Sequence, residues 1–277
     1  MNPTDPRYIA GQYASGDHLA IIAETHRRYG VAAEDVFAVV TRKLLHEQPR
    51  PTQILDIGAG TGQWYASIRR LAGDEPQYTA VDQSAGMAAH LYSRLGSDSR
   101  AEAMEGDARA LPFADKVFDW VGMHFVVYFL PDMRAGLQEA WRLVTHGGAM
   151  ACATNGLRPH YELWDLQEEA VHRLGLPGAG QSVTASDRFN LDNGAELFPS
   201  PPEVYRWPAG FRFDEADAVV RYLAAGPIRK HLGDCADDVP VRNAALAWIR
   251  QAVDRHIARH GVFMVRSEVG FFLARRH

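Results

Sequence analysis

The 277-residue chain has few of the features that would indicate secretion or membrane insertion. It contains two cysteines, Cys152 and Cys235, and Cys152 lies in an apolar run typical of a buried strand, where a thiol behaves as a small hydrophobic side chain. The longest apolar run, 117–130, is too short to cross a bilayer and contains Asp119. The first residues lack the basic and apolar regions of a secretory signal. We therefore expect a reducing, cytoplasmic compartment and no membrane contact.

Clustered positive charge is also scarce. The formal net charge is −5, and lysines and arginines are scattered, with only a short basic pair at Arg275 and Arg276. A protein that binds a polyanion needs a basic patch or stripe, so we expect no nucleic-acid partner. The composition, 47% hydrophobic and 23% charged, is ordinary for a globular protein with a sizeable core. The length predicts one domain with an elaborated insertion.

Apolar and helical patterns alternate along the first half of the chain. Residues 17–46 show two helical runs separated at Gly30, with Asp35 as a plausible cap of the second. Between residues 53 and 154, five short apolar strands alternate with amphipathic helices. This alternation predicts a parallel sheet covered on both faces. Right-handed crossovers then place the carboxyl ends of the strands along one edge, where ligands bind in such sheets.

The predicted fold is α/β, with a doubly wound, mostly parallel sheet of seven strands. The last two strands come from a C-terminal hairpin with its turn near Ser267 and Glu268, and two helices are expected near 215–224 and 241–260. We divide the chain into an N-terminal helical lid (1–50), an α/β core (51–154), a cap insertion that holds the substrate (155–260) and the C-terminal hairpin (261–277).

A glycine-rich turn, ILDIGAGTG at 54–62, follows the first strand. The strand brings Asp56 to its carboxyl end, and glycines at alternate positions from Gly58 lead into a helix at Gln63. Glycine tolerates positive φ and lets a ligand approach the backbone closely. A dinucleotide-binding turn of the form G-x-G-x-x-G would need a glycine where this chain has Gln63. Alone, the turn indicates a nucleotide-like ligand and leaves its identity open.

Acidic turns follow the next two strands. At the end of the second strand, Asp82 in the sequence VDQS can accept both hydroxyls of a ribose, although Asp is also a common helix N-cap at such junctions. At the end of the third strand, Asp107 can bind the amine and ring nitrogens of adenine, while Met87 and Ala108 cover the ring. The alternative for this segment is a plain polar turn. Glycines and an acid together also admit a nicotinamide enzyme.

These turns, with FDWV at 118–121 and LQEAWRLVTHGGAM at 137–150, resemble the class I S-adenosylmethionine-dependent methyltransferases in order and spacing over about residues 53–154. The resemblance implies a Rossmann-like fold, S-adenosylmethionine as cofactor, no metal, and methyl transfer as the activity. The layout is similar to that of small-molecule methyltransferases of microbial secondary metabolism. The resemblance assigns to the cofactor Asp56, Gly58, Gly60, Asp82, Asp107 and Ala108. The predicted cofactor-binding set also includes Tyr13, Gln83, Met87 and His124.

The catalytic residues have weaker sequence signals than the cofactor-binding residues, because the cofactor supplies the electrophile and the protein mainly aligns the acceptor. A general base helps with a hydroxyl or an acidic carbon and is less needed for an unprotonated amine. His124 is the first candidate, since it should project from the carboxyl end of the fourth strand beside the sulfonium, flanked by Met123 and Phe125. A hydrogen-bonded wall residue is the equal alternative, and the role does not transfer from relatives. His160 is the second candidate.

The acceptor pocket is expected where the cap insertion opens, and the N-terminal segment is expected to close over the cofactor. Tyr13 belongs to that segment, and for its tyrosines a packing role is equally open. The predicted acceptor-binding residues are Tyr8, His18, His160, Tyr161 and Trp164. We expect a small-molecule acceptor and leave the methylated atom open. Rival readings are a nicotinamide oxidoreductase, a methyltransferase acting on RNA or protein, and a binding protein that kept the fold. A homodimer is also left open.

Overall fold

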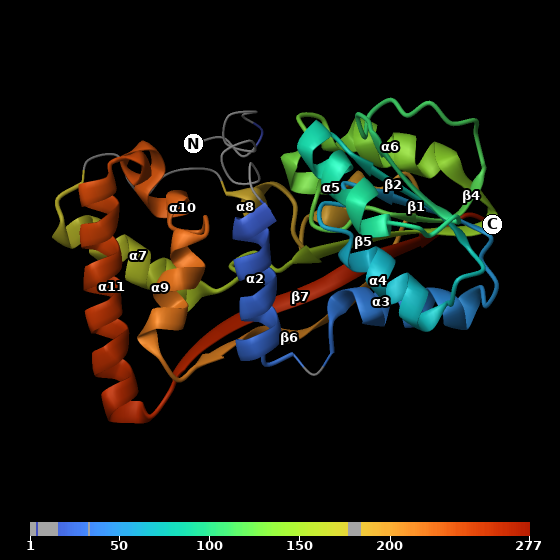
Figure 1. Ribbon diagram of the computed structural model, residues 1–277. Coiled ribbons are helices and arrows are strands. Elements are labelled where there is room, and N and C mark those ends of the chain that lie inside the picture. The colour runs from blue at the N-terminus through green and yellow to red at the C-terminus, as the bar shows by residue number, and fades with distance from the viewer. Residues whose placement is uncertain (1–3, 5–15, 33, 177–183) are drawn as a thin grey trace. The chain divides into compact units, whose positions relative to one another are not determined.

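The structure is a computed structural model that describes residues 4, 16–32, 34–176 and 184–277 (Figure 1). The described strands are β1 (Gln53–Ile57), β2 (Gln77–Asp82), β3 (Ala101–Glu105), β4 (Phe118–Gly122), β5 (Val144–Asn155), β6 (Glu203–Phe213) and β7 (Phe263–Arg275). The described α-helices are α2 (Gly16–Tyr29), α3 (Val36–Glu47), α4 (Gln63–Leu71), α5 (Ala85–Leu95), α6 (Met133–Leu143), α7 (Tyr161–Arg173), α8 (Ala185–Arg188), α9 (Ala216–Ala224), α10 (Arg229–Leu232) and α11 (Val239–His260). Short 3-10 helices are η1 (Val127–Phe129), η2 (Gly194–Leu197) and η3 (Gly233–Asp237).

The seven strands form one sheet in the order β3-β2-β1-β4-β5-β7-β6. Strands β1 to β5 pair in parallel, and β7 pairs with β5 antiparallel over residues 149–155 and 269–275. The prediction of a mostly parallel seven-stranded α/β sheet is therefore confirmed. Because the five parallel strands run the same way, their carboxyl ends share one edge, as expected from the βαβ pattern.

The chain divides into two compact units. The sheet unit comprises residues 33–157, 189–207 and 269–277, and the helical unit comprises residues 1–32, 158–188 and 208–268. Both units are discontinuous in sequence, unlike the four contiguous segments expected above. The physical reason is long-range strand pairing, because β6 and β7 each contribute residues to both units.

Within the sheet unit, helices cover both faces of the sheet. Successive strand residues point to opposite faces. Ile54 therefore packs with Trp64 of α4 and the apolar side of α3, whereas Leu55 packs with Leu137 and its neighbours on α6. Ile54 and Leu55 are both fully buried, which explains why the strands read as continuous apolar runs. The doubly wound arrangement follows directly from this two-sided burial.

The C-terminal hairpin predicted over 261–277 is not formed. Phe263–Arg275 is one continuous strand, with no turn at Ser267, and it lies between β5 and β6 in the sheet. A side chain at Gly270 would place its Cβ 2.0 Å from the carbonyl oxygen of Tyr205 on β6, so the two backbones approach very closely. The partner of β7 is β6, which lies some 60 residues earlier in the chain. Strand β6 was not predicted, because its sequence contains proline and glycine, which are typical of loops.

The helical unit has its own apolar core. Helices α7, α9, α10 and α11 pack around aromatic residues of β6 and β7, among them Phe211, Phe213 and Phe263. Helix α11 begins after Asp238, whose side chain accepts a hydrogen bond from Val241 N at 3.1 Å, and ends at a left-handed glycine. Helices α9 and α11 match the two predicted near 215–224 and 241–260. None of the helices in the described part of the chain is long and apolar enough to cross a membrane.

Candidate functional site

The glycine turn after β1 is fixed on two sides. The N–H groups of Gly58 and Ala59 donate to the carbonyl oxygen of Val81 at 2.7 and 3.1 Å, which ties the turn to the end of β2. Gly58 has φ of 72°, and a Cβ there would lie 2.4 Å from Cγ2 of Val126. Only glycine satisfies both constraints. Helix α4 starts at Gln63, so the strand, turn and helix predicted from sequence are confirmed.

Asp82 lies at the end of β2 and faces this turn. Its Oδ2 accepts the N–H of Gly60 at 3.0 Å, and its Oδ1 accepts the N–H of Ser84 at 2.9 Å. The N-cap of α5 is Ser84, whose hydroxyl accepts Met87 N, so the alternative of Asp82 as the cap is wrong. A carboxylate has about four lone-pair positions, so each oxygen of Asp82 retains capacity for another donor.

Asp56 is buried at the end of β1 and accepts a hydrogen bond from the Tyr78 hydroxyl. Burial raises the pKa of Asp56 to about 7, the hydrogen bond from Tyr78 opposes that rise, and the nearby charge of Asp82 adds to it. The group is therefore poised between its acid and carboxylate forms at neutral pH. A cationic ligand placed beside it would favour the carboxylate.

Asp107 and Ala108 follow β3, next to the end of β2, because Gly106 N donates to the backbone oxygen of Asp82 at 3.0 Å. Ala108 is buried and Asp107 is half-buried. Arg109 binds both carboxylate oxygens of Asp107 and lowers the pKa of that carboxyl. Arg109 lies two residues after Asp107 in the sequence, but the ion pair between them was not predicted.

The structure thus brings together most of the residues assigned to the cofactor. The turns after β1, β2 and β3 are hydrogen-bonded to one another, and all lie in the sheet unit. Met87 is buried on α5, and the neighbouring Gln83 is exposed. Tyr13 lies outside the described residues. The residues gathered at this edge are Asp56, Gly58, Gly60, Asp82, Gln83, Asp107 and Ala108.

His124 is placed differently from the prediction. Its ring is buried between Phe37 and Trp64, with ring centroids 5.6 and 4.6 Å away, and its Nδ1 accepts the N–H of Ala153 at 3.3 Å. Nε2 has no hydrogen-bond partner among the described residues. Burial lowers the pKa of His124 to about 3. A base must reach its acceptor and bind a proton near neutral pH, so this placement fits the wall-residue alternative and not a catalytic base.

Phe125 and Val126 lie in the segment that follows β4. Phe125 has φ of 56°, a left-handed conformation that costs about 1–2 kcal/mol for a residue with a Cβ. Its N–H donates to the Ala153 carbonyl at 2.9 Å, so the backbone stays paired with β5 through the turn. Val126 then contacts Gly58. Phe125 was expected beside the sulfonium, but its left-handed conformation and the contact of Val126 with Gly58 have no local sequence signal, because they depend on contacts with other strands.

The predicted acceptor residue His160 lies in the helical unit, directly before α7. It has φ of 59° and its ring stacks on Phe211, with centroids 4.8 Å apart and an interplanar angle of 17°. The rings of Tyr222 and His26 lie 6.1 Å from it. His26 was not singled out from the sequence. The imidazole of His160 therefore lies against aromatic side chains within the helical unit.

The other predicted acceptor residues are distributed along two helices of the helical unit. Trp164 lies one turn after His160 on α7, under the guanidinium of Arg158. Tyr161 lies under the guanidinium of Arg266. His18 lies on α2 and is half-buried. Tyr8 falls outside the described residues.

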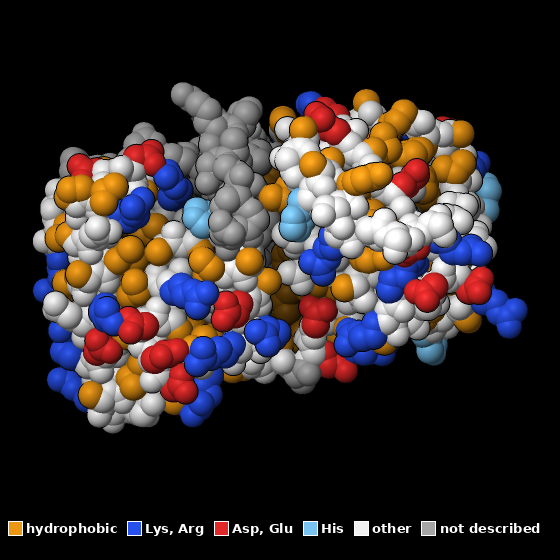
Figure 2. Space-filling model, in the orientation of Figure 1, with side chains coloured by type: hydrophobic (Ala, Val, Ile, Leu, Met, Phe, Trp, Pro, Cys, Tyr) orange, Lys and Arg blue, Asp and Glu red, His pale blue; other side chains and the backbone are white. Residues whose placement is uncertain are grey.

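Charges of both signs are interspersed on the face of the molecule drawn in Figure 2. Among the residues that the structure describes, no group of three or more His, Cys, Asp or Glu side chains could hold a metal ion. Both cysteines are free, and burial raises the pKa of the Cys152 thiol well above its ordinary value. The sheet, the glycine turn and the strand-end carboxylates together define an α/β protein with a site for a nucleotide-like cofactor.

Comparison with known proteins makes this class specific. Residues 54–148 match the family described as "Methyltransferase domain". The chain is 27% identical over 184 residues to the demethylmenaquinone methyltransferase of Staphylococcus aureus, covering 65% of this chain and 74% of that enzyme. The fold resembles that of the YcgJ protein of Bacillus subtilis, with a TM-score of 0.54, 15% identity and coverage of 87% and 99%. It also resembles the [4+2]-cyclase SpnF, with a TM-score of 0.56, 14% identity and coverage of 100% and 98%.

The protein is an S-adenosylmethionine-dependent methyltransferase of class I, and its methyltransferase domain includes residues 54–148. Its cofactor is S-adenosylmethionine, as the sequence motifs predicted. The two solved structures share the fold alone at their level of identity. One of them is a cyclase, so the fold by itself does not determine the reaction.

Proposed function

We propose that the protein transfers a methyl group from S-adenosylmethionine to a small-molecule acceptor, in the biosynthesis of a secondary metabolite. The observation that carries the proposal is the set of turns after β1, β2 and β3, which are hydrogen-bonded to one another through Asp82 and Val81. The Staphylococcus relative is named for a small molecule, demethylmenaquinone, which supports this class of acceptor. The two free cysteines support the cytoplasm as the compartment.

The described residues fit the cofactor. The free lone pairs of Asp82 suit the two ribose hydroxyls. The open backbone of Gly60 suits close approach of the methionine portion, while Gly58 lets the turn pack against Val126. Asp56, with its pKa near neutrality, suits a ligand ammonium group. When bound, S-adenosylmethionine supplies an electrophilic methyl group on a sulfonium. These residues bind and orient the cofactor and take no part in bond making.

The acceptor is proposed to bind in the helical unit at His160. Its imidazole lies on Phe211, with His26 and Tyr222 beside it, so a planar acceptor has aromatic surfaces to pack on and an imidazole to take its proton. With His124 enclosed in the core of the sheet unit, His160 is the base that we propose. Tyr161, the first residue of α7, and Trp164, one turn after His160, complete the proposed acceptor surface.

Calorimetric titration with S-adenosylmethionine, S-adenosylhomocysteine and NAD tests the cofactor assignment. Binding of the first two and none of NAD is expected, and tighter binding of NAD would contradict it. Cofactor consumption over panels of phenols, amines and carboxylic acids then identifies the acceptor class.

His160→Gln is expected to lower turnover about 100-fold or more while cofactor affinity stays the same, as for loss of a general base. The matched control is His260→Gln, which alters an exposed histidine at the end of α11. Equal turnover in the wild type and His160→Gln would remove His160 from catalysis.

A further inference from the structure

The connection from β3 to β4 has an unusual construction. It spans residues 106–117, all of which the structure describes, and contains no helix. The sheet order places β2 and β1 between the strands that it joins. A long segment without helix or sheet pairing must find other partners for its backbone polar groups. Those partners decide how firmly Asp107 and Ala108, at the start of this connection, are held.

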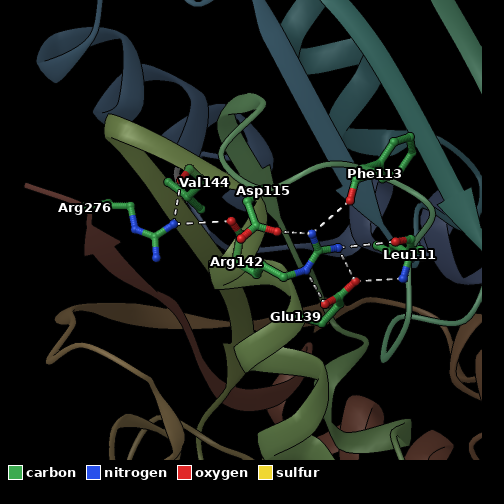
Figure 3. A network of polar contacts seen from close by, with 7 residues as sticks. All are labelled: Leu111, Phe113, Asp115, Glu139, Arg142, Val144 and Arg276. Atoms are coloured by element: carbon green, nitrogen blue, oxygen red, sulfur yellow. Dashed lines mark hydrogen bonds and ion pairs between the residues drawn. The ribbon is translucent and has the colours of Figure 1, made fainter.

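Two side chains of α6 supply the partners (Figure 3). The guanidinium of Arg142 donates from Nη1 to the Phe113 carbonyl at 2.9 Å and from Nη2 to the Leu111 carbonyl at 3.3 Å. Glu139 accepts the Leu111 N–H at 2.8 Å. The same carboxylate binds Arg142 through both of its oxygens at 2.8 Å, and Asp115 binds Nη1 of Arg142 at 2.6 Å. Arg142 and Glu139 therefore act as one bidentate unit.

The held segment is continuous with the cofactor turn. Ala110 N donates to the Asp107 carbonyl at 3.0 Å, and Leu111 comes directly after this turn. The Leu111 side chain is buried and lies against Gly106, where a Cβ would be 3.2 Å from its Cδ2. Moving Leu111 thus moves both the backbone and the packing of the Gly106–Asp107–Ala108 turn.

We infer that Arg142 and Glu139 are positioning residues for the adenine end of the cofactor site. They fix Leu111 and Phe113, and through them the turn whose Asp107 we propose to accept the adenine amine. The inference rests on that proposed role of Asp107. It also assigns a physical task to Arg142 within the segment LQEAWRLVTHGGAM at 137–150.

A matched arginine at the opposite edge allows this role to be separated from general stability. Arg69 donates to Asp98 at 2.7 Å and to the carbonyls of Pro76 and Arg100 at 3.1 and 3.2 Å. Like Arg142, it joins backbone carbonyls to a carboxylate through one guanidinium. Pro76 and Arg100 directly precede β2 and β3, so Arg69 acts at the amino ends of the strands and not at the cofactor edge.

The experiment compares the dissociation constants of S-adenosylhomocysteine and S-inosylhomocysteine, in which a carbonyl replaces the amine of adenine. A carboxylate that accepts the amine loses its donor in the inosine analogue, so the wild type should prefer the adenine compound by about tenfold or more. In Arg142→Gln the preference should fall below about threefold, whereas Arg69→Gln should keep the wild-type value. A variant that was merely less stable would not change this ratio.

Two further variants complete the test. Glu139→Gln breaks the ion pair but keeps an acceptor for Leu111 N, so it should lower the preference by a smaller factor, about threefold, and it serves if Arg142→Gln does not fold. Asp107→Ala should abolish the preference.

An unchanged preference in Arg142→Gln, or in Glu139→Gln if only that variant folds, overturns the positioning role. If Asp107→Ala has lost the preference, the adenine contact of Asp107 is supported even though the positioning role of Arg142 and Glu139 is refuted. An unchanged preference in Asp107→Ala refutes the adenine contact itself.

Discussion

The enclosure of His124 predicts a specific loss of stability in mild acid. The native pKa is about 3, because the ring lies between Phe37 and Trp64. In the unfolded chain the imidazole has a pKa of about 6.5. Between these values the unfolded state binds one more proton than the native state, so the free energy of unfolding falls as the pH falls.

The size of the effect follows from the two pKa values. Lowering the pH from about 7.5 to about 5.0 should remove about 2 kcal/mol of stability through His124 alone, because protonation is then nearly complete in the unfolded state and still absent in the native state. Below about pH 5 the loss continues at about 1.4 kcal/mol per pH unit until the native ring begins to protonate near pH 3.

His124→Asn is the variant that isolates this contribution. The Asn carbonyl oxygen can replace Nδ1 as acceptor for the N–H of Ala153, and the side chain does not titrate. Urea unfolding of wild type and variant at both pH values gives four free energies. Any cost of the smaller side chain is the same at both pH values, as are the other titrating groups, so only the difference between the two pH slopes matters.

The wild type should lose about 2 kcal/mol more than His124→Asn over this range. Equal losses would mean that the imidazole is protonated in the folded protein near pH 5, and that it has solvent or an acidic partner. In that case the argument that excludes His124 as a base would fail together with its stability effect.

Three further perturbations have defined outcomes. Asp82→Ala should weaken S-adenosylmethionine binding about 10- to 100-fold by calorimetry. Asp119→Ala removes a carboxylate at the other end of β1 and should leave this affinity unchanged. Equal affinities in the two variants would refute the ribose contact. Gly58→Ala should destabilise the fold by about 1–3 kcal/mol in urea, and Val126→Ala in that background should recover part of the loss; simple additivity would contradict the predicted overlap. S-adenosylmethionine affinity should rise from about pH 6 to about pH 8 as Asp56 ionises, and be flat in Asp56→Asn; a flat wild-type profile would mean that Asp56 does not face the ligand ammonium.

The placement of much of the candidate cofactor site in the fold could be predicted because its signals are local. An apolar strand, a turn that needs positive φ, and an acid at the next strand end are each written in a few adjacent residues, and the parallel topology brings them together. Asp56, Gly58 and Asp82 accordingly lie where the sequence placed them. The orientation of the His124 side chain has no such local signal. It depends on Phe37 from α3 and on the left-handed backbone at Phe125, neither of which is signalled near residue 124.

Strand β6 was missed for a related reason. Its sequence contains Pro208 and Gly210, which indicate a loop when only neighbouring residues are considered. In the structure, a Cβ at Gly210 would lie 1.9 Å from the carbonyl oxygen of Val265 on β7, so the glycine permits close approach of two strands. A pairing between segments more than 50 residues apart has no signal within either segment. The error in β6 also produced the error in the C-terminal hairpin.

The position of β7 between β5 and β6 has a consequence for the order in which the protein is made. Of the seven described strands, β7 is the last to leave the ribosome, yet it occupies an interior place in the sheet. Until it emerges, β5 has an open edge and β6 has no neighbour to pair with. The first five strands, with the cofactor turns, are complete much earlier and are able to pair during synthesis. We therefore expect nascent chains truncated before residue 263 to expose a sheet edge that chaperones recognise.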